Sequence, residues 1–178
     1  MPYRNRAIAA QTKADNAGCD TAHARRLLNA NINPSTGLAT DYLNRFNEAI
    51  MLLEMVASCP ECIEELDRWK PMSYREHFLA SGFTGRDLAI AAYEDADPAV
   101  RASLDALATT MTTVIEATRS TMAHQLPPHA AGPLAERAAA WLKLLVARAG
   151  AVINGEIDSD FMPDTRQAAV DGLMRRSA

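Results

Sequence analysis

The sequence is poor in aromatic residues and in cysteine, and it contains no long uninterrupted apolar run. Only 6% of its 178 residues are aromatic, whereas Ala and Met are plentiful. Because sheets favour aromatic and β-branched residues and helices favour Ala, Leu and Met, this composition predicts an all-α fold. The two most apolar stretches are interrupted by Glu54 and Lys143, so neither approaches the roughly 20 apolar residues that a membrane span needs.

The three cysteines are odd in number and too few for a disulfide framework. Their count fits reduced thiols, and the first residues contain no apolar stretch of signal-peptide length. We therefore expect a soluble, cytoplasmic protein.

Common catalytic and cofactor-binding signatures are also missing. The sequence contains no GxxxxGK[ST], GxGxxG, GxSxG or HExxH pattern, and no Glu-x-x-His pair of the kind that holds iron in helical bundles. In proteins that have them, these patterns bind phosphates, dinucleotides, zinc or iron, or they position the nucleophile of an esterase. The sequence therefore favours a non-enzymatic role without a cofactor.

Charge is unevenly distributed along the chain. The net charge is -4, which gives no general attraction to nucleic acids or to anionic membranes. Residues 1–30, however, contain five basic and two acidic residues and carry a net charge of +3. We expect residues 1–37 to form a mobile basic N-terminal arm with one short helix, and residues 38–178 to form a helical bundle domain.

The first strong helix pattern covers residues 41–57. Its apolar residues share one helical face, at spacings of three and four residues: Leu43, Phe46, Ile50 and Leu53. Several short helical segments follow. A capping box at Ser73-Tyr74-Arg75-Glu76 predicts the start of one of them.

The two longest helix patterns lie in the C-terminal half. The first begins at Asp97-Pro98 and continues to about residue 124. A Pro-rich turn, residues 126–133, then leads into a helix with Pro133 at its first position. A turn of this length joins antiparallel neighbours, so we expect an αα-hairpin inside a single bundle of about five to seven helices. The apolar face expected for the last long helix consists of Leu134, Ala138, Trp141, Leu145, Ala149 and Val152.

Two cysteines stand one helical turn apart in Cys59-Pro60-Glu61-Cys62. At the start of a helix this spacing is compatible with a redox pair, because the helix dipole stabilises a thiolate on the first cysteine. It is also compatible with half of a zinc site that Cys19 and His23 complete, which gives the Cys₃His set that structural zinc accepts. The third interpretation, which we favour, is that Cys59 and Cys62 are small hydrophobic residues under a helix cap.

A weaker pattern concerns small-ligand binding. In the helix of residues 98–124, Thr109, Thr113 and His124 lie on a face of small Ala and Thr residues. If a neighbouring helix leaves space beside this face, these three side chains provide the polar contacts of a ligand pocket.

Apolar residues also occur on the outer side of the helix of residues 41–57. With its apolar stripe facing the core, a step of about 100° per residue turns Met51, Leu52 and Met55 away from that core. Either this helix is covered on both sides, or these residues form a contact surface of the adaptable kind that Met provides. We therefore expect a regulatory or adaptor protein that acts through protein–protein interaction or as a homodimer. A thiol-redox enzyme or sensor and a small-ligand-binding bundle are the alternatives.

Removal of residues 1–18 tests the expected arm. Because this segment has no apolar face to bury, its deletion should leave helicity and melting temperature nearly unchanged in circular dichroism. A loss of more than about 2 kcal/mol in the free energy of unfolding, which is the size of one buried core side chain, would show instead that the segment packs on the bundle.

Overall fold

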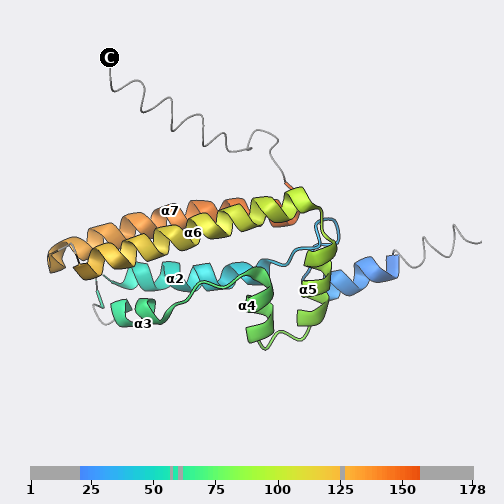
Figure 1. Cartoon of the computed structure of the whole chain (residues 1–178), viewed down its shortest axis with the longest axis horizontal. Coiled ribbons are helices and arrows are strands. Elements are labelled where there is room, and N and C mark those ends of the chain that lie inside the picture. Colours follow the sequence, from blue (N-terminus) through green and yellow to red (C-terminus); the bar gives the residue numbers. More distant parts are fainter. Residues whose placement is uncertain (1–20, 57, 60–61, 125–126, 157–178) are drawn as a thin grey trace, which may run out of the picture.

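The computed structural model describes residues 21–56, 58–59, 62–124 and 127–156, and most of these are helical (Figure 1). The helical elements are, in chain order, residues 21–29, the 3-10 turn η1 (Thr40–Leu43), and the α-helices α2 (Asn44–Met55), α3 (Cys62–Arg68), α4 (Tyr74–Ala80), α5 (Arg86–Asp95), α6 (Pro98–His124) and α7 (Pro128–Asn154). The only β-type backbone pairing in the described part is an isolated bridge between Ile32 and Ala39, and this part contains no strand. The all-α class is therefore confirmed. Among the described helices, none combines the length and the apolarity that crossing a membrane requires.

Helices α6 and α7 form the expected αα-hairpin. They lie antiparallel and side by side along the length of the molecule, with α2 packed against α7 and α3 packed against α2 (Figure 1). The short helices α4 and α5 lie near the start of α2, away from α3 (Figure 1). The core between these helices contains large, fully buried side chains: Phe46 and Leu53 of α2, Leu66 of α3, Leu104, Met111 and Ile115 of α6, and Leu142 and Ile153 of α7.

The start of α7 differs from the prediction. The helix begins at Pro128, whose missing N–H needs no partner in the first turn, and Pro133 lies inside it. An internal proline removes one backbone hydrogen bond, here to the carbonyl of His129. The Ala-rich residues around Pro133 and the packing of Leu134 against the core favour continuation of the helix in spite of this loss. Residues 128–133 of the expected turn are therefore helical.

The buried face of α7 also differs from the prediction. Trp141, expected in the core, is 59% exposed, whereas Ala135, Ala139 and Leu142 are buried. The reason is that α7 packs against both α6 and α2, so its buried stripe faces the space between these two helices. Small side chains on that stripe allow both neighbours to approach closely, and the large indole ring remains outside.

Residues 27–38 pack against the bundle instead of forming part of an arm. Ile32 is 1% exposed, and the hydroxyl of Thr36 donates a hydrogen bond of 2.6 Å to the carbonyl of Ile153 in α7. The apolar residues of this segment are isolated and have no helical period, which is why periodicity did not reveal their burial. The arm was expected over residues 1–37, but residues 27–37 of it pack on the bundle. Residues 1–20 lie outside the described part of the chain.

Seven of the eight aromatic residues in the described part form one connected cluster at the junction of η1, α2, α4 and α5. Neighbouring ring centroids lie between 4.5 and 6.1 Å apart, and the members are Tyr42, Phe46, Trp69, Tyr74, Phe78, Phe83 and Tyr93. Tyr74 is central, since its ring stacks on Tyr93 at 4.5 Å and its hydroxyl accepts a hydrogen bond of 2.9 Å from the amide of Ala39. The predicted capping box is confirmed, and its residues Ser73 and Glu76 lie on either side of Tyr74 in the chain. The capping box and the aromatic cluster thus both determine the position of α4.

Replacing Tyr74 with Phe tests the central contact of this cluster. The change leaves the buried amide of Ala39 without an acceptor, so the free energy of unfolding should fall by about 1–3 kcal/mol in chemical denaturation. Tyr93→Phe is the matched control, because the Tyr93 hydroxyl donates to the exposed carboxylate of Asp105, where water can replace it. We expect a smaller loss in the control, and equal losses in the two variants would contradict this role of the Tyr74 hydroxyl.

Candidate functional site

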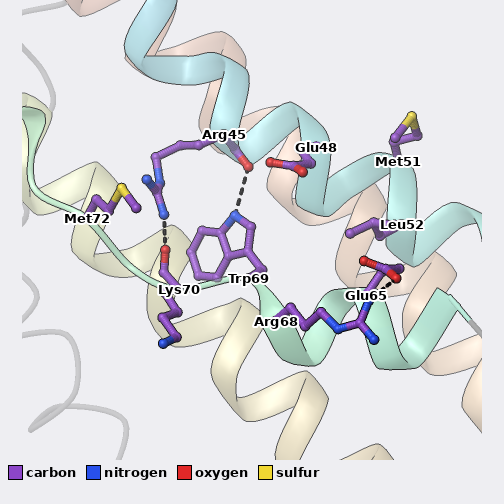
Figure 2. Close-up of a pocket in the computed structure, with 9 residues that line it drawn as sticks. All are labelled: Arg45, Glu48, Met51, Leu52, Glu65, Arg68, Trp69, Lys70 and Met72. Atoms are coloured by element: carbon purple, nitrogen blue, oxygen red, sulfur yellow. Dashed lines mark hydrogen bonds and ion pairs between the residues drawn. The ribbon is translucent and has the colours of Figure 1, made fainter. Parts of the chain in front are cut away.

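Helices α2 and α3 border a groove with a volume of about 350 Å³ (Figure 2). One wall is α2, and the other is α3 together with the segment that follows it. The lining residues are Arg45, Glu48, Met51 and Leu52 of α2, and Glu65, Arg68, Trp69, Lys70 and Met72 of the other wall. None of these described residues carries a hydroxyl, a thiol or an imidazole. The groove is therefore lined by apolar and charged groups.

Arg45 and Trp69, which both line the groove, make a reciprocal contact. The indole N–H of Trp69 donates a hydrogen bond of 2.9 Å to the carbonyl of Arg45, and the Arg45 guanidinium lies 4.9 Å from the Trp69 ring centre. The same guanidinium donates to the carbonyl of Lys70 (Figure 2). Arg45 and Trp69 are only 8% and 6% exposed, so these polar contacts and the cation–π contact form in a largely dry environment, where they are strong.

The charge of Arg45 is the main electrostatic feature of this end of the groove. Burial lowers the pKa of the Arg45 guanidinium, but an arginine remains protonated at neutral pH. Its Nε atom is buried and has no hydrogen-bond partner among the described residues. Burial, and next the positive charge of Arg45, lower the pKa of His77 in α4, so the His77 imidazole is neutral at pH 7.

The outer rim of the groove is rich in methionine. Met51, Met55 and Met72 are 52%, 41% and 37% exposed, and Leu52 is half-buried between α2 and α3. We call Met51, Leu52 and Met55 the Met patch, and Figure 2 shows Met72 at the opposite end of the groove from Met51. Met51 and Leu52 line the groove, whereas Met55 lies one turn farther along α2, outside the lining. In the described part of the chain, the outer face of α2 at Met51 and Met55 is thus not covered.

Sequence reasoning identified the α2 half of this surface and missed the other half. It gave no role in this surface to Lys70 or Met72. The available signal was the lone Met72, exposed between Pro71 and a helix cap. Met72 lies near α2 only because the chain runs back along α2 through α3. No local sequence pattern predicts this return.

The CxxC pair lies beyond the end of α2. Cys59 is half-buried, and its backbone N–H donates a hydrogen bond of 2.8 Å to the carbonyl of Met55. Helix α3 begins at Cys62, whose side chain lies outside the described residues. The redox interpretation of Cys59 and Cys62 therefore stays a prediction.

Two of the four residues of the zinc alternative, His23 and Cys59, lie far apart in the described structure. Residues 21–29, which carry His23, lie at one end of the longest axis of the molecule, and the connection from α2 to α3, which carries Cys59, lies at the other (Figure 1). Cys19 lies outside the described residues. Among the residues that are described, no group of three or more His, Cys, Asp or Glu side chains could hold a metal ion.

The proposed ligand contacts on α6 are exposed to solvent. The hydroxyls of Thr109 and Thr113 donate to backbone carbonyls one turn earlier, at 2.8 and 2.9 Å, and His124 lies exposed at the end of the helix. A second cavity, of about 260 Å³, lies between residues 28–40 and the end of α7. None of the three residues lines either cavity.

Comparison with protein-family models, with curated proteins and with solved structures finds no significant match to this chain.

Exchange of Arg45 for Lys tests the contact between Arg45 and Trp69. Lys keeps the charge but cannot both reach the Lys70 carbonyl and stack on Trp69, so the free energy of unfolding should fall by about 2–3 kcal/mol. Arg68→Lys is the matched control, because the Arg68 side chain is 69% exposed and pairs with Glu65 at the surface. We expect a change of less than about 0.5 kcal/mol there, and an equally small change in Arg45→Lys would contradict the structural role of the guanidinium.

Proposed function

We propose that this protein acts without catalysing a reaction, by binding a protein partner or a second copy of itself at the Met patch. The observation that carries the proposal is the exposure of Met51 and Met55 on the outer face of α2. A surface helix gains no stability from exposed apolar side chains, and a group of them beside a groove is typical of an interaction site.

The shape of the surface supports the same proposal. The apolar rim of the Met patch continues into the groove between α2 and α3, and charged side chains flank it (Figure 2). Grooves of this kind accept the apolar side of a helix, while the charges at the edge select its direction. Methionine suits such a surface because its unbranched side chain adapts to the partner.

The charge of the chain narrows the class of partner. A net charge of -4 disfavours nucleic acids and anionic membranes, so a protein is the better partner. The proposal takes the protein to be cytoplasmic, which the small, odd number of cysteines supports.

The double substitution Met51→Glu with Met55→Glu tests this function. Two carboxylates in the contact would remain unpaired on binding, so association should weaken by at least about a hundredfold. Because both side chains are exposed, circular dichroism and melting temperature should stay close to those of the wild type. Sedimentation velocity measures self-association, and surface plasmon resonance measures binding of a partner.

Leu79→Glu on α4 is the control, since Leu79 is 51% exposed and lies outside the groove lining. It should leave association unchanged. A double variant that unfolds would show that the Met patch belongs to the core, and one that associates like the wild type would place the interaction elsewhere. Either result contradicts the proposal.

A further inference from the structure

We infer that residues 157–164, which we call the acidic segment, run back along the outer face of α7 in their own chain and cover it. The outer face consists of four side chains at spacings of four, three and four residues, so they share one side of the helix: Arg137, Trp141, Leu144 and Arg148. This surface is separate from the Met patch on α2.

The outer face of α7 combines two exposed apolar side chains with two cations. Leu144 is 69% exposed, the highest value for a large apolar side chain in the described part, and Trp141 is 59% exposed. Arg137 and Arg148 are also exposed and flank this pair. Glu136, the only acidic residue of α7, lies about 100° around the helix from Arg137. An apolar surface of this kind, with cations at both ends, fits an apolar segment that carries carboxylates.

The acidic segment has this complementary chemistry. It follows Glu156, the last described residue, and contains three aspartates and no basic residue. In the direction of the chain, two apolar residues stand between two acidic ones: Asp160, Phe161, Met162 and Asp164. Against the direction of the chain, the outer face presents two apolar residues between two basic ones: Arg148, Leu144, Trp141 and Arg137. A segment that runs antiparallel to α7 therefore places unlike charges together at both ends.

The spacings along the two elements agree as well. With a rise of about 1.5 Å per helical residue, the side chains of the outer face lie roughly 12, 18, 22 and 28 Å back from Glu156. An extended chain advances about 3.3 Å per residue, which places the two acidic and two apolar residues of the segment at roughly 13, 17, 20 and 26 Å. Each group thus reaches its counterpart when the segment is extended, and Pro163 favours extended backbone at the residue before it.

The end of α7 lets the chain change direction. Gly155 adopts the left-handed conformation with a φ of +78°, and the backbone N–H of Glu156 donates a hydrogen bond of 2.9 Å to the carbonyl of Ala151, one turn back. Because the acidic segment is joined directly to this end, its effective concentration at the outer face is of the order of millimolar or higher. The segment of the same chain therefore has an advantage over any separate partner.

Acrylamide quenching of tryptophan fluorescence in the full chain tests the inference. The chain has two tryptophans, and Trp69 is only 6% exposed, so acrylamide mainly quenches Trp141. Phe161→Ser with Met162→Ser removes the apolar contacts of the acidic segment. The Stern–Volmer constant should then rise at least about twofold, because a docked segment excludes solvent from the indole ring.

Two controls accompany this variant. Leu173→Ser with Met174→Ser changes an apolar pair beyond the acidic segment and should leave the Stern–Volmer constant unchanged. In a Trp141→Phe background only Trp69 fluoresces, and the substitutions at positions 161 and 162 should then change nothing.

Charge reversal tests the ionic end of the contact. Arg148→Glu and Asp160→Arg each place like charges together, so each substitution alone should raise the Stern–Volmer constant. Combined in one chain, they restore a pair of opposite charges, and the constant should return to the wild-type value.

Three outcomes overturn the inference. The first is a wild-type chain that acrylamide quenches as strongly as the variant with serine at positions 161 and 162. The second is a combined charge variant that remains as strongly quenched as the single variants. The third is a wild-type Stern–Volmer constant that rises on dilution from about 100 μM to about 1 μM, since a contact within one chain does not depend on concentration. That result would assign the outer face to the acidic segment of a second copy.

Discussion

The hydrogen bonds of Trp69 connect three helices, α2, α3 and α6, at one place in the bundle. Its indole N–H donates to the Arg45 carbonyl in α2, and its own carbonyl accepts a hydrogen bond of 2.9 Å from Arg119 in α6. Arg119 also pairs with Asp67 of α3 at 3.4 Å. Hydrophobic burial is non-directional, whereas hydrogen bonds require a defined geometry. These bonds therefore determine where the end of α3 lies relative to α2 and α6.

The groove and the aromatic cluster both follow from that position. The chain leaves Trp69 through Lys70, whose carbonyl is bound by Arg45, and reaches the cap of α4 at Ser73. The aromatic rings make closely packed, stable contacts with one another. Trp69 belongs to this cluster and also lines the groove, which has methionines at its rim. The molecule thus combines a rigid cluster with an adaptable surface, which suits a protein that binds others through one face.

Local chemistry made several features predictable from the sequence. The capping box at Ser73 and Glu76 satisfies backbone groups within one turn, and Gly155 ends α7 because its φ of +78° disfavours other residues. The all-α class and the hairpin of α6 and α7 follow from composition and from periodic apolar residues. Met51 and Met55 were recognised as facing away from the apolar stripe of α2, because helical geometry alone determines which residues share a face.

The sequence by itself determined the helices, most of their ends and the inward face of α2, since these depend on contacts within a few residues. Only the tertiary structure decided which neighbour covers each face. Trp141 is exposed because α6 and α2 approach α7 from two sides, and Arg45 is buried because the end of α3 returns to it. The second wall of the groove, with Lys70 and Met72, depends on the same return of the chain. Such contacts join residues distant in sequence, and their position is set by packing of the whole bundle, which no local pattern encodes.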